Sequence, residues 1–202
     1  MISKADITGI VLAGGQSRRM GFNKAEASLN GESMLTRMIE KLSALTPNLL
    51  LSTGSSTYPN IHWPQIPDEY INCGPLGGIY SAIKASTTPL NIVVSCDMPL
   101  ISSSLLLQLV GQAMENDAMI TVPVDADNQL QLLCAVYHKN ILPLIEKQIK
   151  QKSLKLKMMA SLASVNKVHI NIHHPLYSPH TFTNVNTPGT LKTMRELWQK
   201  DR

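Results

Sequence analysis

The chain has 202 residues, with 18 lysines and arginines against 14 aspartates and glutamates, which gives a net charge of +4. Its hydrophobic content of 44% and charged content of 16% are ordinary for a globular protein and exclude a disordered chain. The mild positive charge suits anionic small molecules and does not require nucleic acid. The length fits one domain over residues 1–202, since no linker-like stretch or internal repeat divides it.

The three cysteines, Cys73, Cys96 and Cys134, lie far apart and form no C-x-x-C pair. This argues against a zinc site or a disulfide framework, and it fits reduced thiols in a cytoplasm. No apolar run has the length of a membrane span, and the first residues do not look like a signal peptide. We therefore expect a cytoplasmic protein that has no membrane partner.

The first apolar run, residues 7–13, predicts a buried strand that ends in a glycine-rich loop. Gly14 and Gly15 let the backbone turn tightly and approach a ligand, and amides in such a loop can cradle an anion. Arg19 and Lys24 add positive charge, so the natural partner is a polyphosphate. The glycine spacing matches neither a Walker A loop nor the dinucleotide fingerprint G-x-G-x-x-G.

The elements that follow alternate between strand and helix. Strands are expected at residues 49–51, 61–66 and 91–95, and helices are expected after Ser33, from Pro75 and after Ser102. The two serines are suited to cap their helices, and the proline fits a first helical turn. This alternation predicts an α/β fold in three layers, with a mostly parallel central sheet between helices.

The second half of the chain is less regular. Segments 119–124 and 131–137 flank the turn sequence Asp125-Ala126-Asp127-Asn128, which indicates a hairpin. Further helices are expected at residues 141–150 and 154–162, a strand at residues 168–172, and a last helix from Pro188.

Asp97 follows the predicted strand 91–95, at the same rim of the sheet as Gly14. A carboxylate facing a polyphosphate is repelled unless a cation lies between them. Magnesium is commonly held by one or two carboxylates together with phosphate oxygens. Asp97 is therefore the expected metal ligand, and a role in capping the turn before Met98-Pro99 is the alternative.

Residues 12–24 fit the pattern L-A-G-G-x-S-x-R-M-G-x-x-K, and this resembles the signature of nucleotidyltransferases of the molybdenum cofactor guanylyltransferase type. Segments 74–78, 96–100, 131–137 and 184–188 look like later landmarks of the same family, in the same order. The resemblance spans nearly the whole chain. It implies a Rossmann-like nucleotidyltransferase domain that joins the GMP part of GTP to molybdopterin and releases pyrophosphate.

The resemblance also implies roles for individual residues. Leu12, Ala13, Gly14 and Gly15 would bind the nucleotide through the backbone, Arg19 and Lys24 would contact phosphate, and Asp68 would lie near the nucleotide. Gly74, Gly77 and Gly78 would approach guanine and ribose, Asp97 would hold Mg²⁺, and Asn184 and Asn186 would sit by the pterin phosphate or the metal. Arg19, Lys24 and Asp97 would be the catalytic residues, because in-line attack by an ionised phosphate needs charge neutralisation and no protein nucleophile. Transient contact with other proteins of molybdenum cofactor biosynthesis is also expected.

One position departs from the family, because Ser52 stands where the family has an asparagine. Serine is shorter and has one donor instead of two, so the contact with the base at this position is open. Two alternatives remain: a related transferase that uses CTP or another acceptor phosphate, or a nucleotide-binding regulator without catalysis. Segments 74–78 and 184–188 favour guanylyl transfer, and the presence of Asp97 argues against a regulator.

Overall fold

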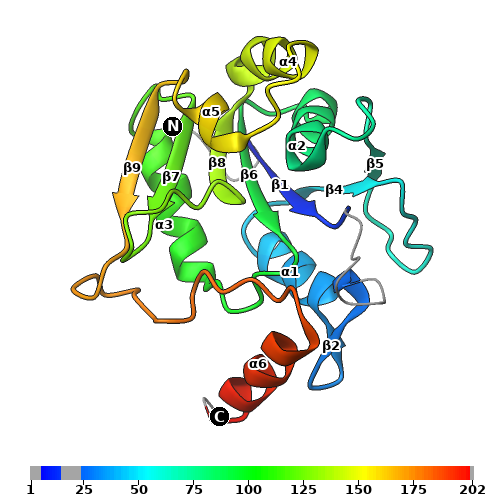
Figure 1. The fold of residues 1–202 in the computed structure, drawn as a ribbon, viewed down its shortest axis with the longest axis vertical. Coiled ribbons are helices and arrows are strands. Elements are labelled where there is room, and N and C mark those ends of the chain that lie inside the picture. Colours follow the sequence, from blue (N-terminus) through cyan, green and yellow to red (C-terminus); the bar gives the residue numbers. More distant parts are fainter. Residues whose placement is uncertain (1–5, 15–23, 201–202) are drawn as a thin grey trace.

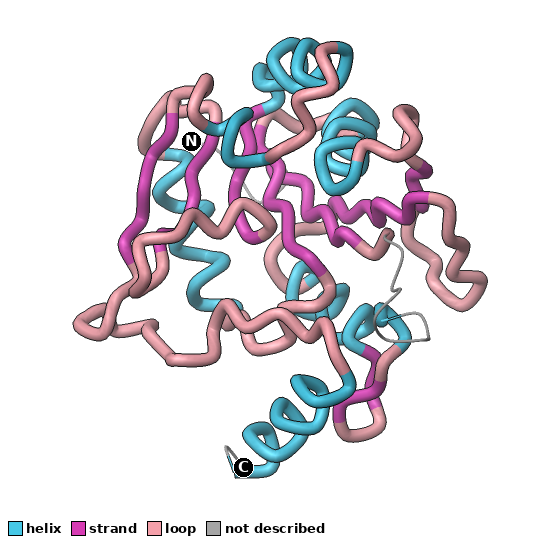
Figure 2. The backbone as a smooth tube through the Cα atoms, viewed as in Figure 1, coloured by secondary structure: helices cyan, strands magenta, loops and turns pink. Residues whose placement is uncertain are grey.

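A mostly parallel sheet forms the centre of the protein (Figures 1 and 2). The structure is a computed structural model that describes residues 6–14 and 24–200, with only the backbone described for Lys24 and residues 198–200. These residues form a seven-stranded sheet in the order β5-β4-β1-β6-β8-β7-β9. The strands are β1 (Ile7–Leu12), β4 (Asn48–Gly54), β5 (Gln65–Pro67), β6 (Leu90–Ser95), β7 (Ile120–Val124), β8 (Cys134–His138) and β9 (Val165–His169). Strand β8 is antiparallel to both neighbours and the other pairs are parallel, so the expected sheet is confirmed.

Helices cover both faces of this sheet (Figure 1). The covering helices are α1 (Met34–Ser43), α2 (Gly74–Ala85), α3 (Ser103–Met114), α4 (Leu142–Lys150) and α5 (Leu156–Ala160). The described residues also form helix α6 (Pro188–Lys200), which lies apart from the sheet, and short 3-10 turns η2 (Lys24–Glu26) and η3 (Lys139–Ile141). Successive strand side chains point to opposite faces, so β1 gives Val11 to the layer under α1 and α3 and Ile10 to the layer under α2 and α4. This confirms three layers. Among the described helices, none is both long enough and apolar enough to cross a membrane.

The helix starts agree with the sequence. The hydroxyl of Ser33 accepts the Thr36 amide at 3.0 Å, and that of Ser102 accepts the Leu105 amide at 3.2 Å. Pro75 lies in the first turn of α2, where its missing N–H leaves no helical bond unmade. These local signals fix where the helices begin, and hence where the preceding loops end.

Several expected strand positions are wrong. Strand β4 continues to Gly54, so Ser52 lies in a strand and not in a loop. The strand expected at residues 61–66 is reduced to β5, because the Gln65 side chain donates to the carbonyls of Tyr58 and Ile61 and holds that segment as a loop. Strand β9 begins at Val165 and overlaps the expected residues 168–172 only at its last two residues, because its partner β7 ends opposite His169.

Other boundaries also differ. Strands β7 and β8 pair only at Ile120↔Tyr137 and Thr121↔Val136, so the expected hairpin is short, although Asp125 does accept the amides of Asp127 and Gln129 in the turn. Helix α5 is shorter than the expected segment 154–162, which starts in an irregular stretch and ends in a turn.

A small hairpin and the last helix form a separate projection at the lower end of Figure 1. The hairpin consists of β2 (Ser28–Leu29) and β3 (Glu32–Ser33), and its turn residues Asn30 and Gly31 have φ of 53° and 91°. The guanidinium of Arg195 in α6 donates to the carbonyl of Ser28 at 2.8 Å. Apolar side chains fill the space between these elements: Ala27, Leu29, Met34, Val185, Leu191 and Met194. Neither of these two short strands is among the strands expected from the sequence.

Candidate nucleotide-binding site

The carboxyl ends of β1, β4 and β6 lie side by side. Leu12 is opposite Ser52 on β4 and opposite Ser95 on β6. Beyond the strands, the amides of Ala13 and Gly14 both donate to the carbonyl of Ser52, at 2.8 and 2.9 Å. The carbonyl of Leu12 accepts the Cys96 amide at 3.1 Å on the other side. The start of the glycine-rich loop is therefore held between β4 and the segment that carries Asp97, at the rim predicted for the ligand.

These bonds change one detail of the expected phosphate loop. The amides of Ala13 and Gly14 already donate to Ser52, so an anion cradle made of backbone amides has to begin after Gly14. Gly15 and Arg19 lie outside the described residues, and the side chain of Lys24 is not described. Their roles stay predictions from the sequence.

Gly14 is required by a close approach of two backbones. A Cβ atom at this position would lie 2.6 Å from the amide nitrogen of Gly54 and 2.8 Å from the carbonyl carbon of Thr53. Backbone atoms cannot move aside as a flexible side chain can. Any larger residue at position 14 would therefore push the loop away from the end of β4.

Tyr58 also supports this loop, and sequence reasoning missed it. Its buried hydroxyl donates to the carbonyl of Ala13 at 2.8 Å, and its backbone is held by the side chain of Gln65. Tyr58 stands in a polar stretch between two strands, where no spacing rule marks it. Only the fold brings it to β1.

Asp68 lies close to two glycines, Gly77 and Gly78, in the first turns of α2. A Cβ atom on Gly78 would lie 3.4 Å from Oδ1 of Asp68 and 2.5 Å from the hydroxyl oxygen of Ser52. A Cβ atom on Gly77 would lie 3.6 Å from Oδ2 of Asp68 and only 2.8 Å from the carbonyl oxygen of Tyr70. The glycines thus let the helix start approach the carboxylate, as their assignment to the nucleotide site requires.

The carboxylate of Asp68 is poorly solvated. Its Oδ1 atom is buried and has no hydrogen-bond partner among the described residues. Burial raises the pKa of Asp68 above its ordinary value, because an ionised carboxylate loses stabilisation when water is removed. An acceptor in this condition is matched to a ligand that brings its own N–H or O–H donors.

Gly74 differs from its two neighbours. It has φ of +57°, in the left-handed region, and a Cβ atom added there would meet nothing within 4 Å. A glycine is favoured at position 74 because of the left-handed turn into α2, and not because another group lies close to it.

Asp97 lies on the other side of β1. Only 3% of it is exposed, and its Oδ1 atom accepts the hydroxyl of Ser95 at 2.5 Å. The amide of Val185 donates to the carbonyl of Asp97 at 2.8 Å, which brings the segment with Asn184 and Asn186 to the same place. Oδ1 of Asn184 is buried and has no hydrogen-bond partner among the described residues.

These groups fit a magnesium ion completed by substrate. Carboxylate and amide oxygens are the ligands that Mg²⁺ prefers, and it usually keeps several sites for phosphates and water. Within the described residues, no group of three or more His, Cys, Asp or Glu side chains could hold a metal alone. Asp97 and Asn184, whose neighbour Val185 bonds Asp97, could therefore supply only some of the oxygen ligands of Mg²⁺.

Comparisons with known proteins agree with this geometry. The family model described as "MobA-like NTP transferase domain" matches residues 9–167. A probable molybdenum cofactor guanylyltransferase from Flavobacterium johnsoniae is 34% identical over 188 residues, which cover 93% of this chain and 96% of that one. The molybdenum cofactor guanylyltransferase from Vibrio cholerae is 31% identical over 194 residues, which cover 94% of this chain and 92% of that one.

The fold is shared with a solved structure. The crystal structure of molybdopterin-guanine dinucleotide biosynthesis protein A from Archaeoglobus fulgidus superimposes with a TM-score of 0.79 at 22% identity, over 96% of this chain and 99% of that one. The resemblance seen in the glycine-rich loop thus extends through the sheet and both helical layers. The chain belongs to the MobA-like NTP transferase family, among the nucleotidyltransferases related to the molybdenum cofactor guanylyltransferases.

Proposed function

We propose that the protein transfers GMP from GTP to molybdopterin and releases pyrophosphate, with Mg²⁺ as the cofactor. The observation that carries this proposal is the pair of carboxylates on either side of the end of β1. On the β4 side, the buried Oδ1 atom of Asp68 lies near Gly78 and has no hydrogen-bond partner among the described residues. On the β6 side, the carbonyl of Asp97 accepts the amide of Val185, the residue after Asn184. The names of the relatives in Flavobacterium and Vibrio support the choice of substrates.

Asp68 favours guanine over the other bases. The Watson–Crick edge of guanine offers two adjacent donors, its ring N–H and its amino group, and one carboxylate can accept both. The same edge of cytosine offers only one donor, its amino group, beside a ring nitrogen acceptor that the second carboxylate oxygen repels. This argues for GTP against the CTP alternative. The hydroxyl of Ser52, close to Gly78, remains available for a single further contact.

Asp97 favours a metal-assisted transfer. Mg²⁺ would supply neutralisation of the phosphate charge, held by the Asp97 carboxylate with Asn184 as a second oxygen ligand. Asn186, two residues further on, is left to the pterin phosphate. The hydrogen bond from the hydroxyl of Ser95 orients the Asp97 carboxylate.

The reaction then needs positioning and charge neutralisation. An oxygen of the terminal phosphate of molybdopterin attacks the α-phosphorus of GTP. The bond from this phosphorus to the oxygen bridging the α- and β-phosphates breaks, and pyrophosphate leaves with the electron pair. Arg19 and Lys24 would neutralise the charge on the leaving group, a role that fits their place after Gly14. All three cysteines are free thiols, which supports a reducing compartment such as the cytoplasm.

Calorimetric titration with GTP, CTP, ATP and UTP, each with Mg²⁺, tests the proposal. We expect tight, magnesium-dependent binding of GTP only, followed by GMP transfer when molybdopterin is added. Asp68→Asn should reduce this preference, because an amide offers a donor where guanine also has donors. A preference for CTP in the wild-type protein, or transfer to another acceptor phosphate, would replace the proposed substrates. Binding of GTP without transfer to molybdopterin would indicate a nucleotide-binding regulator.

A further inference from the structure

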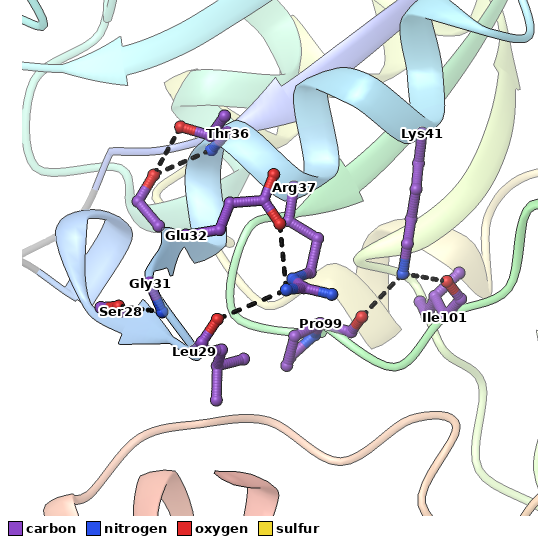
Figure 3. A network of polar contacts seen from close by, with 10 residues as sticks. Ser28, Leu29, Gly31, Glu32, Thr36, Arg37, Lys41, Pro99 and Ile101 are labelled. Atoms are coloured by element: carbon purple, nitrogen blue, oxygen red, sulfur yellow. Dashed lines mark hydrogen bonds and ion pairs between the residues drawn. The ribbon is translucent and has the colours of Figure 1, made fainter. Parts of the chain in front are cut away.

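Two cations lie one turn apart on α1 and reach two different backbone segments (Figure 3). The ammonium of Lys41 donates to the carbonyl oxygens of Pro99 and Ile101, both at 2.7 Å. Nη2 of Arg37 lies 3.0 Å from a carboxylate oxygen of Glu32 in the β2–β3 hairpin. Lys41 therefore binds the turn that follows Asp97, while Arg37 binds the hairpin.

The turn after Asp97 is weakly held by its own backbone. The amide of Met98 donates to the carbonyl of Ser95 at 3.3 Å, and that of Ile101 donates to the carbonyl of Met98 at 3.4 Å. Both distances are long for such bonds. Pro99 has no amide to contribute. The two bonds from Lys41 are shorter than both of these backbone bonds and are charge-assisted, so they contribute more to holding the turn.

The position of Lys41 destabilises the charged form of its side chain. Desolvation and the neighbouring charge of Arg37 lower the pKa of Lys41 to about 8, which means that the folded protein destabilises the ammonium. A methionine has a similar unbranched shape and would carry no such cost. The carbonyls of Pro99 and Ile101 that converge on Nζ, together with the negative charge of Glu32, oppose this destabilisation.

We infer that Lys41 is a positioning residue that holds the Asp97 turn in the orientation needed for Mg²⁺. This inference rests on the proposed function, in which Asp97 is a metal ligand. The turn is fixed from two sides: Val185 bonds the carbonyl of Asp97, and Lys41 bonds the carbonyls two and four residues later. Lys41 touches neither substrate nor metal in this arrangement and acts only through the backbone.

Lys41→Met tests the inference in two ways. In the protein without ligands, hydrogen exchange should become faster at the amides of Met98, Ile101 and Val185, because the turn has lost the two hydrogen bonds from Lys41. In the transfer reaction, the Mg²⁺ concentration for half-maximal rate should rise at least about tenfold, as is typical when support of a metal ligand is lost. Binding of GTP at saturating Mg²⁺ should not change.

Lys150→Met is the matched control, since Lys150 is an exposed lysine that pairs with Glu146 on α4. It should change neither exchange at the turn nor the magnesium requirement. If Lys41→Met is not folded by circular dichroism, Lys41→Gln provides the same measurements with a shorter neutral donor. Unchanged exchange and an unchanged magnesium requirement in the folded variant would overturn the inference. If the wild-type protein transfers no GMP, the proposed function fails, whereas amide exchange still decides whether Lys41 holds the turn.

Discussion

The hydroxyl of Tyr58 lies 2.8 Å from the carbonyl oxygen of Ala13, across 45 positions of sequence. Tyr58 is 4% exposed, so this bond is shielded from water. Together with the bonds from Cys96 to Leu12 and from Gly14 to Ser52, it ties the first residues of the glycine-rich loop to three separate segments. The loop therefore leaves β1 in a direction set by the surrounding fold.

Tyr58→Phe should weaken GTP binding more than it weakens the fold. Loss of one buried hydrogen bond is worth about 1 kcal/mol, or roughly a fivefold rise in KM for GTP. Tyr137→Phe is the control, because its buried hydroxyl also donates to a carbonyl, that of Leu132 at 2.7 Å, and its strand β8 pairs with β6 and β7 and not with β1. Steady-state kinetics and thermal unfolding should show similar stability losses but a change in KM for Tyr58 only. An equal KM in both variants would make Tyr58 a purely structural residue.

Asp97→Asn should abolish magnesium-dependent turnover and leave the fold intact. The amide oxygen of asparagine can still accept the hydroxyl of Ser95, so the local structure is retained while the charge for the metal is lost. We expect a fall in kcat of about 10²-fold or more, the scale for losing one charge-stabilising group. Asp127→Asn, in the exposed β7–β8 turn, is the control. Full activity of Asp97→Asn would show that the carboxylate of Asp97 does not bind the metal.

Asp68→Asn should maintain or raise the stability of the unliganded protein while it lowers affinity for GTP. The folded-state pKa of Asp68 is raised by desolvation, so this group favours folding below its unfolded pKa of about 4 and loses that contribution as pH rises through the folded value. At neutral pH the buried charge is a net cost that the variant removes. Urea denaturation at pH 7 and at pH 4 should show a stability difference between variant and wild type that shrinks in acid. A variant less stable at pH 7 would mean that the carboxylate has partners in the folded protein.

Lys24→Ala should reduce turnover by about 10²-fold or more without a large change in stability, because its proposed role is to stabilise charge on phosphate. Its place in the signature pattern is the basis of this prediction. Rapid-quench measurement of GMP transfer at saturating GTP would separate this effect from weaker binding. A rate equal to that of the wild type would assign Lys24 to the solvated surface.

Stability of the wild-type protein should gain a contribution from Lys41 as pH rises from about 8 to about 10.5. Its pKa falls from an ordinary value of 10.5 to about 8 on folding, so the unfolded chain binds more protons in this window. The cost of the buried ammonium is fully present below pH 8 and is relieved above it. Denaturant unfolding across this range should therefore show a steeper rise for the wild type than for Lys41→Met. Parallel curves would mean that Lys41 titrates as an exposed lysine does.

Much of the fold could be predicted because its signals are local. The apolar run at residues 7–13, the caps at Ser33 and Ser102, and Pro75 each act within one turn or strand, so the sequence marks them directly. The expected ends of strands were wrong where a partner strand, and not a local signal, sets the boundary. Strand β9 ends where its partner β7 ends, and no residue type within β9 marks that end in the sequence.

The candidate site divides in the same way. The sequence by itself determined the glycine-rich loop, the carboxylate after β6 and their family resemblance, because spacing along one segment carries those patterns. Only the tertiary structure decided that Oδ1 of Asp68 is buried near Gly78, that Tyr58 donates to Ala13, and that Lys41 donates to Pro99 in the turn after Asp97. Those relationships join segments far apart in the chain, and burial and hydrogen bonding between such segments exist only once the sheet and its helices have assembled.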